Sequence, residues 1–171
     1  MPEVRMKPVI TYFKYLLRST NEHGVHSPFV YDLVTKALRH KDKMPKHPTA
    51  KELPFFDSLP GKYQRALNNS LHHLFGAEAP VIALGSFVNT LTSGASLVFL
   101  ESQDQLEPTA IAPLLERLGN ETVILLNKTS DTPLWRALTQ HPEIHLTVDC
   151  HRIGMAWKRA QQAKENFTIR L

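Results

Sequence analysis

The sequence predicts one α/β domain whose hydrophobic pattern changes from helical to strand-like about halfway along the chain. The 171 residues are 42% hydrophobic and 21% charged, which suits a single folded domain with a proper core. Residues 1–75 carry apolar side chains at helical spacing, whereas residues 80–171 contain short apolar runs and alternating stretches. We therefore expect a single domain over 1–171, with a helical cap region at 1–75 and a sheet region at 80–171.

Three stretches in the first part have the apolar spacing of amphipathic helices. The first covers residues 8–19. The second begins at Ser27 and Pro28, because serine caps a helix start and proline fits the first helical position. The third covers residues 63–75, and Gly76 is placed to end it.

Short continuous apolar runs in the second part predict parallel strands that are buried on both faces. They lie at residues 81–84, 97–100 and 122–126. A helical pattern at 111–118 lies between the last two runs and completes a β-α-β unit. Another helical pattern follows at 133–138.

The last part alternates between apolar and polar residues. The stretches 144–148, 153–157 and 167–171 have this period of two, with a tight connection at 150–152. We expect them to be antiparallel strands added to the edge of the sheet.

Charge and composition limit the classes of function. The chain has 20 basic and 16 acidic residues, a net charge of +4, which permits contact with nucleic acid but does not demand it. Its single cysteine, Cys150, cannot form an internal disulfide. No apolar run is long enough to span a bilayer, and no signal-peptide core follows residues 1–5. These features favour a cytoplasmic protein without a membrane segment.

A basic segment, residues 36–51, overlaps the stretch 39–60. The prolines of that stretch predict a surface connection with a short turn at 53–57. The basic residues of the segment 36–51 are Lys36, Arg39, Lys41, Lys43, Lys46 and Lys51. They could contact phosphates, but no aromatic residues are interleaved for stacking on bases. We favour a solvated loop.

Candidate cofactor ligands follow two of the predicted strands. Gly85 and Ser86 end the first, and a glycine turn there could let a nucleotide cofactor approach the backbone. Glu101 ends the second, where a carboxylate could bind a ribose or an amine. One glycine is a weak pattern, so we favour a strand-ending turn and a solvated carboxylate.

No metal site and no catalytic residue are assigned. None of the nine histidines has a cysteine or paired carboxylate at metal-ligand spacing. Cys150 and His151 are neighbours, and adjacent residues of a strand point to opposite faces, which is poor geometry for a nucleophile and its base.

Both ends of the chain carry a more specific pattern. Residues 22–31 read Glu-His-Gly-Val-His-Ser-Pro-Phe-Val-Tyr, and residues 167–170 read Phe-Thr-Ile-Arg after Gly154 and Lys164. This pattern resembles a family of class I S-adenosylmethionine-dependent methyltransferases from Bacteroidetes. The resemblance covers about residues 8–40 and 95–171.

The resemblance implies a seven-stranded sheet capped by N-terminal helices, with a Glu-Leu-Gly loop that holds S-adenosylmethionine. This sequence has no such loop. The family's fourth strand tends to end in Asp-Gly, but here residues 101–104 read Glu-Ser-Gln-Asp. Its fifth tends to end in paired aspartates, but here residues 127–129 read Asn-Lys-Thr. The acids that would face cofactor and substrate are therefore replaced.

We expect a shortened class I methyltransferase-like (Rossmann-like) sheet with N-terminal helices and an antiparallel C-terminal strand pair. It would be a degenerate member without a cofactor, acting through protein contacts. Strands lost between residues 61 and 79 would leave an unpaired sheet edge, which the helix at 63–75, a homodimer or a protein partner could cover. Two alternatives remain: an active methyltransferase binding S-adenosylmethionine through residues 84–89 and Glu101, and a nucleic-acid-binding module using residues 36–51.

Overall fold

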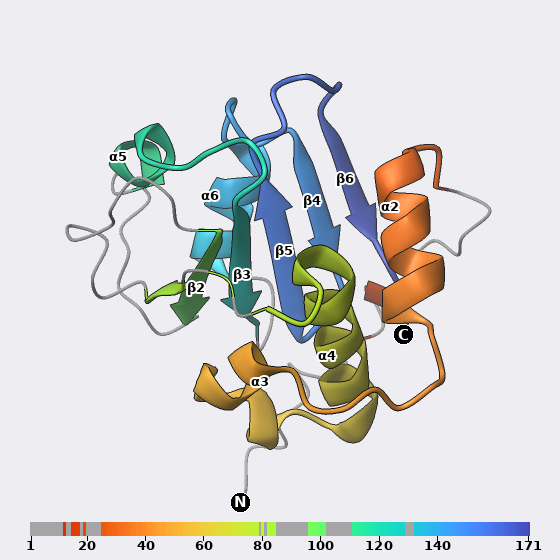
Figure 1. Ribbon diagram of the computed structural model, residues 1–171. Coiled ribbons are helices and arrows are strands. Elements are labelled where there is room, and N and C mark those ends of the chain that lie inside the picture. Colours follow the sequence, from red (N-terminus) through yellow and green to blue (C-terminus); the bar gives the residue numbers. More distant parts are fainter. Residues whose placement is uncertain are drawn as a thin grey trace, which may run out of the picture.

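A six-stranded mixed sheet forms the centre of the protein, with the strand order β1-β2-β3-β5-β4-β6 (Figure 1). The computed structural model describes residues 12, 15–17, 19, 25–78, 80, 82–84, 96–101, 111–128 and 132–171. The strands are β1 (Ile82–Leu84), β2 (Leu97–Glu101), β3 (Val123–Asn127), β4 (Leu146–Asp149), β5 (Ile153–Trp157) and β6 (Glu165–Thr168). The α/β class predicted from the sequence is confirmed.

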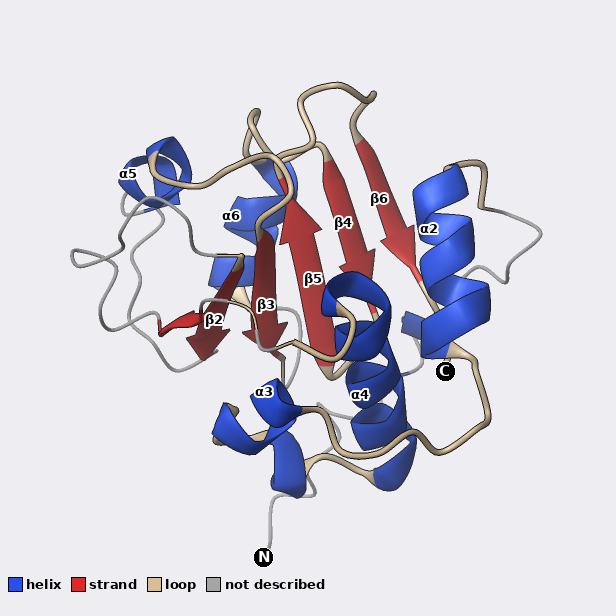
Figure 2. Ribbon diagram, viewed as in Figure 1, coloured by secondary structure: helices blue, strands red, loops and turns tan. Residues whose placement is uncertain are grey.

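Helices lie on both faces of the sheet (Figure 2). They are α2 (Pro28–Leu33), which continues as the π-helical segment Val34–Leu38, then α3 (Pro48–Glu52), the 3₁₀ turn Phe56–Ser58, α4 (Gly61–Phe75), α5 (Ile111–Glu116) and α6 (Pro133–Gln140). None of the described helices is long and apolar enough to cross a membrane.

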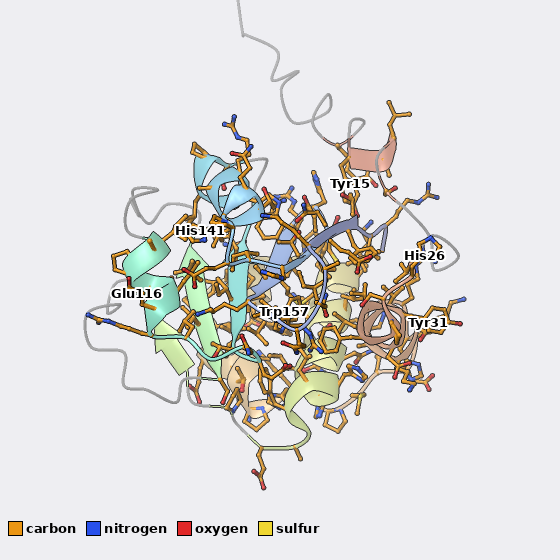
Figure 3. All side chains as sticks on the ribbon, turned by 90° about the horizontal axis from the view of Figure 1, so that it is seen from above. Tyr15, His26, Tyr31, Glu116, His141 and Trp157 are labelled. Carbon is orange, nitrogen blue, oxygen red and sulfur yellow. The ribbon has the colours of Figure 1, made fainter. Side chains whose placement is uncertain are left out.

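Two hydrophobic cores result from the alternation of side chains along the strands. Phe99 and Leu125 belong to the core shared with α2, α3 and α4. Val98 and Ile124 belong to the core shared with α5 and α6. Because both faces are covered, the central strands are apolar at nearly every position, which is why they read as continuous runs in the sequence. Trp157, 1% exposed, lies near the middle of the molecule in Figure 3.

Strand directions agree with the sequence for all but the last strand. β1, β2 and β3 are parallel, as predicted. β4 and β5 form the predicted antiparallel pair, and β5 is inserted between β3 and β4. The prediction for the last strand was wrong, because β6 pairs with β4 in parallel. β5 returns the chain to the end of the sheet where β4 begins, so the next strand starts there and runs in the same direction as β4.

Two further expectations about the helices need correction. The stretch 39–60 is not only a surface connection, because it contains α3 and a 3₁₀ turn. The helix expected at 63–75 begins at Gly61, and its apolar side chains pack into the core on one face of the sheet rather than over a sheet edge. Gly76 ends it with a φ of 68°, as its position predicted. Helix α4 therefore fills most of the interval in which the lost strands were expected.

The start of α2 follows the predicted pattern. The Ser27 side chain accepts a hydrogen bond from the Val30 N–H, and Pro28 occupies the first turn, where its missing N–H needs no partner. In Figure 3, Tyr31 on this helix lies on the side of the molecule opposite Glu116.

A buried histidine caps α3. The His47 side chain accepts a hydrogen bond from the Thr49 N–H at 3.2 Å through Nδ1, so its Nε2 carries the hydrogen that faces the Gly76 carbonyl at 3.2 Å. The ring also packs edge-on against His72, with centroids 4.8 Å apart. Burial, followed by the nearby His72, lowers the pKa of His47 below its usual value.

The free energy of unfolding is expected to fall as the pH drops from about 7.5 to about 5.5, partly through His47. Its pKa is lowered in the folded protein, so the unfolded chain binds more protons below about pH 6.5, and acid favours unfolding. His47→Asn removes this titration while keeping a side chain that can cap. Urea unfolding gives the free energy of unfolding of each protein at pH 7.5 and at pH 5.5. The decrease between these two pH values should be smaller for His47→Asn than for the wild type. Equal losses would contradict the role given to His47.

Candidate functional site

Polar side chains lie at the carboxyl ends of β3 and β4. In Figure 1 the arrowheads of β2, β3, β4 and β6 point to the same end of the sheet, and β5 points the other way. Ligands of open α/β sheets bind outside the carboxyl ends of the strands. This end is therefore the place to look for a functional site.

A nearly buried ion pair links the two strand ends. The Lys128 Nζ lies 2.5 Å from the Asp149 Oδ2, and these side chains are 3% and 22% exposed. Lys128 directly follows β3, and its backbone N–H donates to the Arg152 carbonyl at 2.8 Å. Asp149 is the last residue of β4. A lysine ammonium is buried this deeply only when it has a partner, so each of these residues depends on the other.

An aromatic ring covers the ion pair. The Lys128 Nζ lies 4.4 Å from the ring centroid of Trp135, on α6, which adds a cation–π contact. Gly154 on β5 makes room for this arrangement. A Cβ atom there would lie 2.6 Å from Trp135 and 2.9 Å from the Lys128 Cδ. The sequence offered a glycine inside a strand, which is typical of such a close approach.

The turn between β4 and β5 is held by the same aspartate. The other carboxylate oxygen of Asp149, Oδ1, accepts a hydrogen bond from the His151 N–H at 2.8 Å. His151 has a φ of 69°, in the left-handed region, and this side-chain-to-backbone bond stabilises the strained turn. Both oxygens of Asp149 therefore have structural partners.

On the other face of the strand ends lie buried aromatic and thiol groups. The Tyr15 hydroxyl donates a hydrogen bond to the Ile169 carbonyl, and its ring lies 5.0 Å from that of His151. Burial raises the pKa of Tyr15 and of the Cys150 thiol well above their usual values. Burial, then Arg152, lowers the pKa of His151. Burial therefore favours the protonated form of the Cys150 thiol, which is a weaker nucleophile than the thiolate.

Of the three candidate cofactor ligands, the structure describes only the backbone position of Glu101. Gly85 and Ser86 lie outside the described residues. Glu101 ends β2 and is the register partner of Asn127, so the ends of β2 and β3 meet at the same edge. Its side chain is outside the described part of the structure.

The strand order bears on where a cofactor could bind. Ligand crevices of open sheets form where the strand order reverses. Among the described strands, β1, β2 and β3 follow each other in the sheet in the order in which they occur along the chain, so no reversal separates them.

The basic segment is partly neutralised by acidic neighbours. Lys36 lies 2.7 Å from Asp32, and Lys46 lies 2.9 Å from Asp57. Arg39 donates to the Arg170 carbonyl. No group of three or more histidine, cysteine or acidic side chains that could hold a metal ion occurs among the described residues.

The chain matches no protein-family model, no curated protein and no solved structure.

Proposed function

We propose that the protein is a methyltransferase-like domain that does not transfer methyl groups and acts by binding other proteins in the cytoplasm. The observation that carries this proposal is the Lys128–Asp149 pair beneath Trp135. At the strand ends where an α/β enzyme holds its cofactor and substrate, Lys128 and Asp149 are paired with each other, and both oxygens of Asp149 already accept hydrogen bonds.

Two further observations support this proposal. The parallel strands β1 to β3 run in one direction across the described sheet, without the reversal that opens a nucleotide crevice. The fifth strand of the resembled family tends to end in paired aspartates, whereas residues 127–129 here read Asn-Lys-Thr, and the Lys128 ammonium is paired with Asp149.

The edge of the sheet supplies the candidate contact surface. β1 is the terminal strand of the described sheet and pairs on one side with β2. An unpaired strand edge must be covered or paired with another chain. We propose that β1 pairs with a second copy or a protein partner. Sedimentation at micromolar concentration should show a dimer if the partner is a second copy, and a strict monomer would contradict the homodimer.

Titration with S-adenosylmethionine in a calorimeter tests the loss of cofactor binding. We expect no saturable heat from the folded chain, with folding verified by circular dichroism on the same sample. Saturable binding in the micromolar range would contradict the proposal and favour an active methyltransferase using Gly85, Ser86 and Glu101. In that case Glu101→Gln should weaken the binding, whereas the exposed change Lys41→Gln should not.

A further inference from the structure

A pocket of about 370 Å³ lies over the polar side of α4, away from the sheet. Its floor is made by α4 residues at helical spacing, from Gly61 through Arg65 to Asn69. Its walls are the segment 43–46 and the residues Phe56 and Asp57. In Figure 1 the chain between α2 and α3, which includes the segment 43–46, crosses the lower part of α4. A volume of this size suits a small metabolite.

Side chains of α4 hold both walls in place. Asn68 accepts from the His47 N–H at 2.8 Å and donates to the Pro45 carbonyl at 3.0 Å. Gln64 donates to the Asp57 and Leu59 carbonyls, at 3.2 and 2.9 Å. Because these bonds fix backbone to helix, the pocket is built before any ligand arrives, which lowers the entropic cost of binding.

The pocket is basic. Three of its lining side chains are cationic (Lys43, Lys46 and Arg65) and one is anionic (Asp57), a formal charge of +2. Asp57 pairs with Lys46 at 2.9 Å, so Lys43 and Arg65 supply the excess charge. The N-terminus of α4, 15 residues long, contributes partial positive charge at Gly61, and no side chain of the described residues caps it.

Two buried atoms that belong to lining residues lack partners. Neither the Arg65 Nε nor the Asn69 Oδ1 has a hydrogen-bond partner among the described residues. Asn69 is 2% exposed, and its amide nitrogen donates to the His40 and Asp42 carbonyls, which fixes the orientation of its amide group. An unsatisfied buried polar group costs about 1–3 kcal/mol. Both atoms have almost no accessible surface, so they make the floor of the pocket polar without contacting a ligand themselves.

We propose that this pocket binds a small phosphate monoester. The phosphate, with a charge of about −1.5 to −2 at neutral pH, matches the charge of the pocket and accepts from the guanidinium of Arg65 and the ammonium of Lys43. A carboxylate would match only half of the charge, and a bare sugar would leave the cations unpaired. The site is separate from the strand ends, so it holds or fails independently of S-adenosylmethionine binding.

Calorimetric and amide-shift titrations at fixed ionic strength test the proposal, with ribose 5-phosphate, inorganic phosphate and ribose as probes. We expect saturable binding of ribose 5-phosphate, weaker binding of inorganic phosphate and none of ribose. The amide of Gly61 and the side-chain amide of Asn69 should shift, whereas the amide of His151 should not. Absence of saturable binding by both phosphates would overturn the proposal. Equal affinity for both would overturn the monoester assignment.

Charge-reversal variants separate the pocket from general attraction of anions. Lys43→Glu should weaken binding of ribose 5-phosphate at least about tenfold, because it reverses a charge at the ligand. Lys41→Glu, an exposed lysine two residues away that does not line the pocket, is the matched control and should change the affinity less than about twofold at this ionic strength. Arg65→Gln should weaken binding as well. Equal losses at Lys41 and Lys43, together with tighter binding of a 12-nucleotide oligouridylate, would overturn the pocket in favour of a nucleic-acid surface.

Discussion

Asp149→Asn is expected to lower the free energy of unfolding by about 3 kcal/mol, the lower part of the range for breaking a buried ion pair. The substitution keeps the size of the side chain and an oxygen that can accept from the His151 N–H, but it removes the charge opposite the Lys128 ammonium. The Lys128 side chain is 3% exposed, so its ammonium would have to be neutralised or hydrated within the core. The partial exposure of Asp149 is the reason for expecting the lower end of the range.

Substitution of Lys128 should lower the free energy of unfolding less than substitution of Asp149. Both changes remove the ion pair, but only the change at Asp149 leaves a buried charge without its partner. Lys128→Met keeps a stem of similar length over Trp135 and leaves a carboxylate that water can reach. We expect a loss of about 1 kcal/mol, and the double variant should be close to Lys128→Met alone. Urea unfolding of the four proteins gives the coupling energy of the pair. Asp32→Asn, which breaks the exposed pair with Lys36, is the control and should change stability by less than about 0.5 kcal/mol.

If Asp149→Asn and Asp32→Asn lowered the free energy of unfolding equally, this account would be contradicted. Equal losses would mean that the Lys128–Asp149 pair is hydrated like a surface pair, and the strand ends would then be open to a ligand. The stability measurement therefore also bears on the proposed function, because that proposal requires these two residues to be structural.

Local patterns allowed much of the fold to be predicted. The start of α2 at Ser27 and Pro28 depends on hydrogen bonds within one turn, and Gly76 ends α4 through its own φ angle. The parallel strands β2 and β3 were predictable because burial on both faces requires apolar residues at successive positions. In each case the residues that determine the structure lie within a few positions of it.

The parts that were missed depend on contacts between distant segments. A period of two places side chains on alternate faces but does not encode the direction of a strand, so the parallel pairing of β6 was not predictable. Helix α3 has five residues and is capped by His47, an uncommon cap that depends on burial against α4.

The candidate sites were missed for the same reason. Lys128 and Asp149 are 21 residues apart in the sequence, and only the sheet brings them together. Arg65 and Asn69 read as the polar side of an amphipathic helix, and nothing local indicates that another segment covers them. Such pairs become visible only when the tertiary structure is known.

Gly154→Ala is expected to lower the free energy of unfolding by about 2 kcal/mol, within the range for overpacking a core. The added methyl group would lie 2.6 Å from the Trp135 Cζ3 and 2.9 Å from the Lys128 Cδ. The lysine stem is flexible, but the indole ring is rigid and belongs to the core formed with α5 and α6. The methyl group therefore forces α6 or β5 to move.

Gly119→Ala is the matched control, since a Cβ atom at Gly119 would meet only the Thr122 Oγ1, at an ordinary 3.5 Å. Thermal unfolding should show a clear drop in Tm for Gly154→Ala and a change near zero for Gly119→Ala. The strain and the ion pair both involve Lys128, so the effects of Gly154→Ala and Lys128→Ala, which removes the Cδ atom, should not add. Removing the long lysine chain eases one of the two clashes, and the double variant should be more stable than the sum of the single losses predicts. Strict additivity would show that Trp135 alone opposes the methyl group, and that Gly154 serves the packing of α6 rather than the burial of the ion pair.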